Sequence, residues 1–86
     1  MEVILDGLEL RNMEELHDRF APLFPPFYGR NLDALFDCLT EPGEPIAVTI
    51  RHRETLIERL GRGGRALEEL LHRAAAENPR LTVTAD

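Results

Sequence analysis

The residues best suited to chemistry are two acids in the stretch FYGRNLDALFDCLT, residues 27–40. Asp33 and Asp37 are four residues apart, which places both carboxylates on one face of a helix. Like charges at this spacing destabilise a helix by about 0.2–0.5 kcal/mol. The helix dipole favours an acid at Asp33, near the helix start, but it no longer helps at Asp37. Because the fold gains nothing visible from Asp37, the pattern indicates a role outside the fold.

Two carboxylates can act as a general acid and a general base. A paired-acid enzyme needs a substrate cleft, however, and a core built from 86 residues has little room for one. An acidic face beside exposed Phe27 and Tyr28 is more typical of a surface that docks into a basic cavity of another protein. We therefore expect a binding protein and not an enzyme, with a small enzyme that uses His17 or the acids as an alternative.

The other reactive side chains predict no metal site and no cofactor. His17, His52, His72 and Cys38 fall on different predicted elements without the spacing of metal ligands. His17 follows the apolar face of the first helix and is interpreted as a packing residue. A catalytic cysteine needs a lowered pKa and a nearby base. Nothing near Cys38 supplies either, so we expect it to be structural.

The net charge of −6 lies mostly in the first part of the chain. Residues 1–50 hold ten acids and three arginines, whereas residues 51–86 hold six acids and seven arginines. An acidic surface repels phosphate backbones, which disfavours direct binding of nucleic acid. The same surface attracts a basic protein and speeds the encounter with it.

Hydrophobic periodicity predicts three strands and four helices in one domain over residues 1–86. Strands are expected at 2–5, 46–50 and 81–84, and helices at 12–21, after an Asn31 cap, at 54–60, and from the Gly63-Gly64 pair to residue 77. Strands separated by helical crossovers predict an α/β fold with a three-stranded parallel sheet packed by about four helices. The strand at 46–50 has only Thr49 as a polar residue, so we expect it to be covered on both faces.

Smaller features complete these expectations. The prolines at 22, 25 and 26 predict an extended loop, and the spacing of Arg65, Glu69 and Arg73 predicts exposed ion pairs on the fourth helix. No apolar run reaches the roughly 20 residues of a membrane span. The N-terminus lacks the pattern of a signal peptide, and a lone cysteine excludes an internal disulfide. We therefore expect a cytoplasmic protein that is monomeric when free.

The stretch at 27–40 closely resembles the signature of the barstar family, intracellular inhibitors of the secreted ribonuclease barnase. The shared motif is YG-x-NLDAL-aromatic-DCLT, and His17 and Cys38 also have counterparts. The resemblance covers nearly the whole chain. It implies a barstar-like fold that blocks a basic, barnase-like extracellular ribonuclease by inserting the second helix and the loop before it into the active site.

The resemblance also implies residue roles. Asp37 would replace the substrate phosphate, Asp33 would pair with a cation at the guanine end of the site, and Phe27 would pack against a catalytic histidine. The full set of implied partner-binding residues is Phe27, Tyr28, Gly29, Asn31, Asp33, Ala34, Phe36, Asp37, Thr40 and Glu44.

Several positions depart from the family pattern. Phe27 replaces a tyrosine, Phe36 replaces a tryptophan, and Arg65 falls where the family has an acid that contacts the enzyme. The loop EPGEP at 41–45 lacks the family's aromatic residue. These departures favour a ribonuclease other than barnase, or weaker binding to barnase. A binding module of the same fold with a partner that is not a nuclease stays an alternative.

Overall fold

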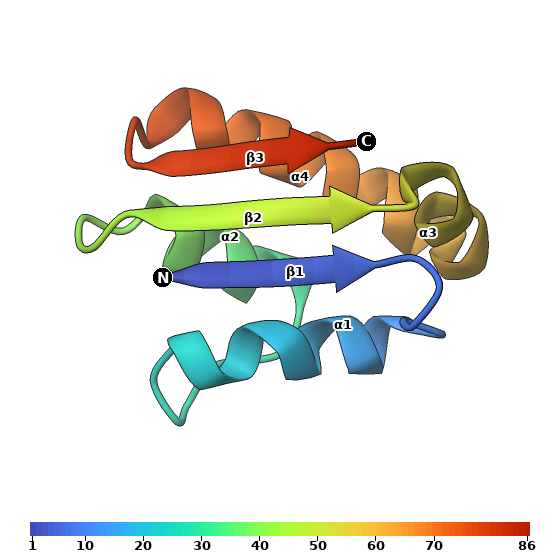
Figure 1. Cartoon of the computed structure of the whole chain (residues 1–86). Helices are drawn as coiled ribbons and strands as arrows, with labels where there is room; N and C mark the ends of the chain where they lie inside the picture. The colour runs from blue at the N-terminus through green and yellow to red at the C-terminus, as the bar shows by residue number, and fades with distance from the viewer.

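The three predicted strands form one parallel sheet in the computed structural model, which describes residues 1–86. The strands β1 (Glu2–Asp6), β2 (Ile46–Arg51) and β3 (Leu81–Ala85) lie in the order β1-β2-β3, with β2 in the centre (Figure 1). Val48 of β2 lies opposite Val3 on one side and Val83 on the other. The predicted α/β fold with a three-stranded parallel sheet is therefore confirmed.

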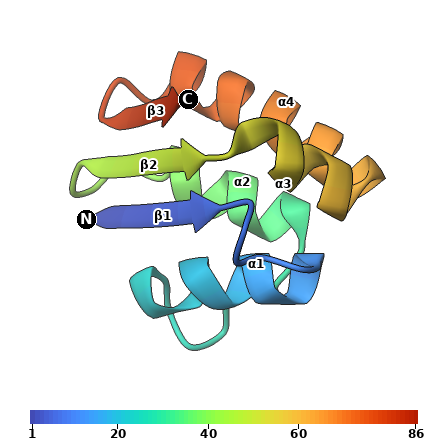
Figure 2. The same cartoon turned by 45° about the vertical axis from the view of Figure 1, so that its right-hand side comes forward.

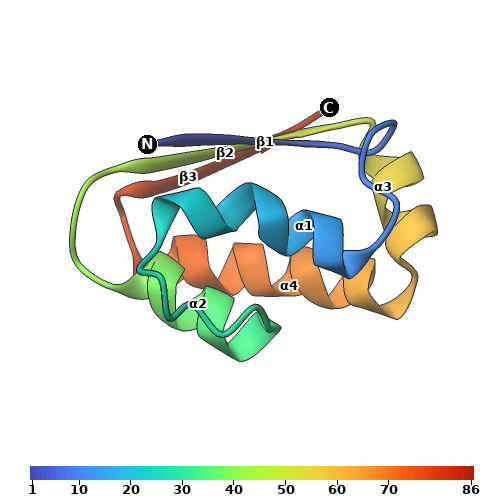
Figure 3. The same ribbon diagram turned by 90° about the horizontal axis from the view of Figure 1, so that it is seen from below.

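The helices lie on one face of this sheet, except for one short helix at its end. They are α1 (Met13–Phe20), α2 (Leu32–Thr40), α3 (Arg53–Leu60) and α4 (Arg62–Glu77), with a short 3-10 helix η1 (Ala21–Leu23). Right-handed crossovers that step along a sheet in one direction place their helices on the same face. Figure 3 shows the resulting layers, in which α1 and α4 lie beneath the sheet and α2 lies farthest from it. The short α3 lies beyond the carboxyl end of β2 (Figure 2). No helix has both the length and the apolar composition needed to cross a membrane.

The hydrophobic core lies between the sheet and the helices. Leu5, Leu16, Phe20, Leu35 and Leu39 are completely buried there. Removing each such side chain from water contributes about 1.5–3 kcal/mol relative to leaving it exposed. These residues come from β1, α1 and α2, so the same core fixes the sheet and the helix that carries the two acids.

The expectation that β2 is covered on both faces is wrong. Ile46, Val48 and Ile50 are buried on the helical face, but Ala47 and Thr49 on the other face are only half-buried. No helix covers that second face, because both crossovers run on the first. The neighbouring strands shield the central strand from the sides, which is sufficient for small residues there.

Two local predictions are also wrong. Pro22 lies in η1, a continuation of α1, where the sequence predicted an extended loop. The pair Gly63-Gly64 lies inside the first turns of α4, and only Gly61, with φ of 60°, separates α3 from α4. A Cβ at Gly64 would lie 2.9 Å from the Ile57 backbone, so this glycine allows close packing of two helices.

Gly64→Ala is therefore expected to lower the free energy of unfolding by about 1–3 kcal/mol, the usual cost of overpacking, although alanine has the higher helix propensity. Gly63→Ala is the matched control in the same turn. Its new Cβ would meet the side chain of Met13 at 2.7 Å, and that side chain can change rotamer. Chemical denaturation measures both variants. A Gly64→Ala protein more stable than Gly63→Ala would contradict the close-packing explanation.

Candidate protein-binding site

Local sequence on α2 positions the two acids. The Asn31 side chain accepts a hydrogen bond from the Ala34 amide at 2.8 Å, which confirms the predicted N-cap. Leu35 and Leu39 are completely buried and hold the inner face of α2. Asp33 and Asp37 occupy the opposite side and are exposed. The cap and the buried stripe together fix the direction in which both carboxylates project.

The two acids line an open groove between α2 and α4 with a volume of about 460 Å³. The groove is lined by Leu32, Asp33, Phe36, Asp37, Ala66, Glu69, Leu70 and Arg73. The ion pairs of the molecule are Arg11–Glu15, Arg30–Asp18, His52–Asp6 and Arg53–Glu68, and none involves Asp33 or Asp37. Both carboxylates are thus charged groups without an intramolecular counterion, available to a partner.

Sequence reasoning missed the α4 side of this groove. The predicted ion pairs among Arg65, Glu69 and Arg73 do not form. Instead, the guanidinium carbon of Arg73 lies 5.0 Å from the centre of the Phe36 ring, a cation–π contact between α4 and α2. Arg65 is exposed and does not line the groove. The helical spacing of residues 66, 69, 70 and 73 could have indicated a second shared face on α4.

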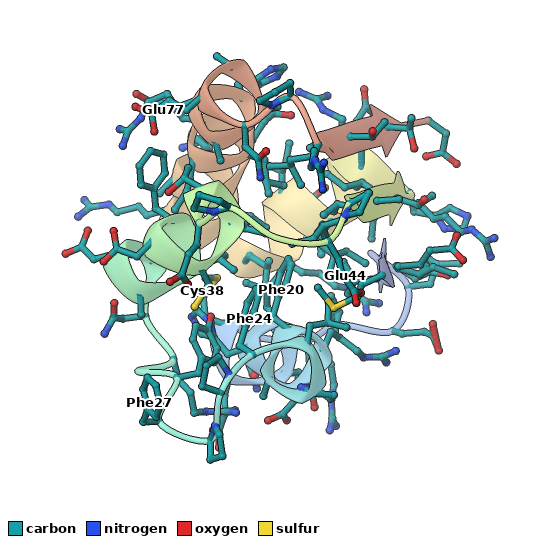
Figure 4. All side chains as sticks on the ribbon, turned by 90° about the vertical axis from the view of Figure 1, so that its left-hand side faces the viewer. Phe20, Phe24, Phe27, Cys38, Glu44 and Glu77 are labelled. Carbon is teal, nitrogen blue, oxygen red and sulfur yellow. The ribbon has the colours of Figure 1, made fainter.

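The loop before α2 presents one aromatic ring and buries another. Phe27 is 86% exposed, as expected, and Figure 4 shows it projecting away from Phe20 and Phe24. Tyr28 is buried, so its predicted exposure is wrong. Its ring lies edge-on to Phe24 at a centroid distance of 5.2 Å, and its hydroxyl is hydrogen-bonded to Nδ1 of His17. Tyr28 therefore fixes the loop to α1 instead of presenting a contact surface.

Burial determines the protonation of this pair. It raises the pKa of Tyr28 to about 12, chiefly by desolvation. Desolvation, followed by the nearby charge of Arg30, lowers the pKa of His17 below its ordinary value of 6.5. Both groups are consequently neutral at pH 7, and His17 is the buried packing residue that the sequence predicted.

Arg30 and Gly29 serve the geometry of the loop. Arg30 has φ of 54° and its guanidinium pairs with Asp18 and donates to the Glu14 carbonyl at 3.1 Å. A Cβ at Gly29 would lie 3.2 Å from Nδ2 of Asn31. The loop is thus tied to α1 on one side and to the α2 cap on the other.

Thr40 and Glu44 lie away from the groove that holds the acids. They line a separate hollow of about 830 Å³, formed by the loop after α2 and the turn before β3. The Thr40 hydroxyl donates to the Phe36 carbonyl at 2.8 Å. Arg80 holds the loop by donating to the Gly43 carbonyl at 2.9 Å. A partner that touches Asp37 and Glu44 together would therefore have to extend past the carboxyl end of α2.

Cys38 lies on α2 beside the core and is half-buried. Desolvation, with smaller contributions from Glu41 and Asp37, raises the pKa of its thiol. A raised pKa disfavours the reactive thiolate, in keeping with a structural cysteine. No group of three or more histidine, cysteine or acidic side chains is arranged to hold a metal ion.

The fold and the groove define a small α/β protein with an acidic helix exposed for binding. A family model described as Barstar (barnase inhibitor) matches residues 1–85, and the chain belongs to the barstar family. This is a family of inhibitors and not of enzymes. A protein of Bacillus subtilis (strain 168) named "Putative ribonuclease inhibitor YrdF" is 54% identical over 41 residues. That match covers 45% of this chain and 45% of the relative, so it spans less than half of either protein.

Substitutions at two neighbouring loop residues should show that one stabilises the fold and the other does not. Tyr28→Phe leaves Nδ1 of buried His17 without its partner, and we expect it to lower the free energy of unfolding by about 1–3 kcal/mol. Phe27→Ala removes an exposed ring and is expected to change that free energy by less than about 0.5 kcal/mol. Denaturant titration of the two variants measures the difference. Equal stability of Tyr28→Phe and the wild type would show that the hydrogen bond does not hold the loop.

Proposed function

We propose that this chain inhibits a ribonuclease by placing α2 and the loop before it in the active site of the enzyme. The observation that carries the proposal is the exposure of Asp33 and Asp37 on one face of α2, without an intramolecular counterion. Membership in the barstar family, described as barnase inhibitors, supports it. So does the partial match to a relative whose name is that of a ribonuclease inhibitor.

The chemistry of a ribonuclease site fits this face. An enzyme that cleaves RNA must bind a phosphate, and it does so with cationic groups. Asp37 takes the place of that phosphate, and Asp33 pairs with a further cation at the guanine end of the site. Phe27 packs against the catalytic histidine. Each carboxylate loses water on binding, and a charged partner at hydrogen-bonding distance offsets that cost.

The rigidity of the site favours tight binding. A partner gains most affinity from groups that need no ordering when they bind. The Asn31 cap and the buried leucines fix α2, and Tyr28 fixes the loop that presents Phe27. The backbone segments that carry Phe27, Asp33 and Asp37 are consequently fixed before the enzyme binds.

The proposed partner is a basic, secreted, barnase-like ribonuclease. Its inhibitor would act as a monomer in the cytoplasm, as an immunity protein or antitoxin against that enzyme. The excess of acids in residues 1–50, which include α2, supports attraction to a basic enzyme.

Asp37→Ala should raise the inhibition constant by several powers of ten and leave the melting temperature unchanged or slightly higher. Truncating one partner of a buried charge pair costs about 2–5 kcal/mol or more, a range to which measurements on the barnase–barstar pair themselves contribute. Asp33→Ala should cost less binding energy and slightly lower the melting temperature, because Asp33 also supports the helix start. Titration of ribonuclease activity beside thermal unfolding measures both effects.

Glu58→Ala is the matched control for charge, because Glu58 is exposed on α3, lies outside both hollows, and forms no ion pair. It should inhibit like the wild type. Inhibition by Asp37→Ala equal to that by Glu58→Ala would exclude insertion of α2 into the active site.

Association with a basic ribonuclease should depend strongly on salt. The acids of the binding face act over distance, and the Debye length falls from about 30 Å at 0.01 M salt to about 10 Å at 0.1 M. We expect the association rate constant to drop steeply across this range while the dissociation rate constant changes little. Stopped-flow fluorescence measures both constants, and a flat association rate would argue against electrostatic steering.

A further inference from the structure

Arg73 is the only basic residue that lines the acidic groove between α2 and α4. It is exposed, and it forms no ion pair with the carboxylates of the chain. Glu69 and Glu77 lie four residues before and after it on α4, at the spacing that usually gives helical ion pairs. A guanidinium carries five N–H donors, and no carboxylate of the molecule uses those of Arg73.

The Phe36 ring holds this guanidinium in place. The distance of 5.0 Å between the guanidinium carbon and the ring centre is a cation–π contact. Phe36 lies three residues after Asp33 and one residue before Asp37, so the contact places the guanidinium in the groove that both acids line, without an ion pair to either. A cation–π contact uses none of the N–H donors of the guanidinium, so a carboxylate can accept two of them.

We infer that Arg73 determines which ribonucleases this chain binds, an inference that rests on the proposed function. An enzyme surface that is basic throughout would place cations against Arg73 as well as against Asp33 and Asp37. An enzyme that presents a carboxylate beside its active-site cations would pair with all three charges. The groove selects the second kind of enzyme, because like charges across an interface are repelled while opposite charges add affinity.

A purely structural role for Arg73 makes different predictions. If the arginine only joined α4 to α2 through the ring, its charge toward a partner would not matter. Reversing that charge would then alter stability without changing the salt dependence of association. The selective role predicts that affinity for a basic enzyme rises as the charge at position 73 goes from positive to neutral to negative.

The test uses barnase as a basic ribonuclease probe for the full chain and for Arg73→Gln, Arg73→Glu and Arg73→Lys. We expect Arg73→Glu to bind barnase about 10–100-fold tighter than the wild type, Arg73→Gln to be intermediate, and Arg73→Lys to match the wild type. Most of the gain should appear in the association rate at low salt. Arg62→Glu, an equal charge change at an exposed α4 position outside the groove, is the control and should gain less than about threefold. Circular dichroism checks that each variant is folded.

Each outcome bears on the inference. If the wild type does not inhibit barnase, Arg73→Glu is expected to do so, and its failure would overturn the inference. A loss of affinity in Arg73→Glu, or a gain no larger than that of Arg62→Glu, would also overturn it. Asp37→Ala tests the proposed function separately. It is made in the wild type or in Arg73→Glu, whichever binds barnase. If Asp37→Ala leaves barnase affinity unchanged while Arg73→Glu changes it tenfold, active-site insertion would be rejected and the selective role of the groove retained.

Discussion

The placement of both helical crossovers on one face of the sheet is the constraint on which the rest of the structure depends. A parallel sheet in the order β1-β2-β3 needs two crossovers that step in the same direction, and right-handed connections then fall on the same side. The sheet face is occupied by α1 and α4, so α2 is left in the layer farthest from the sheet (Figure 3). An outer helix has one face on the core and a wide face in water, which is the geometry that a binding helix needs.

The same constraint explains why residues of one short motif divide between fold and surface. Tyr28, Asn31, Leu35 and Leu39 hold the loop and the helix against α1 and the core. Phe27, Asp33 and Asp37 project outward between them. A match to the whole motif therefore carries two kinds of information, because some of its positions hold the scaffold and others form the exposed face. The buried positions make the exposed ones rigid, which lowers the entropy lost on binding.

Local patterns predicted the parts of the structure that depend on neighbours in sequence. The Asn31 cap follows from residue type, and the shared outward face of Asp33 and Asp37 follows from helical spacing. Predictions failed where the deciding contact joins distant segments, as when Arg73 contacts Phe36 instead of forming the predicted ion pairs on α4. Tyr28 is buried, with its hydroxyl bonded to His17 on another element. Gly63-Gly64 lies inside α4 instead of separating two helices, and Gly64 packs closely against α3. The strand β2 lacks a second helical layer. Propensity and periodicity carry no information about such contacts.

The roles proposed for Asp33, Asp37 and Arg73 would divide affinity and selectivity between two helices of this fold. The acids are on α2, whose inner face is fixed by the core, so a partner can bind them without disturbing the fold. Arg73 is on α4, where its guanidinium contacts α2 through the Phe36 ring. A change at position 73 alters the field that a partner meets and leaves the cap, the core and the anchored loop intact. In the proposed function, α2 in the outer layer supplies the attraction, and its neighbour α4 selects among ribonucleases.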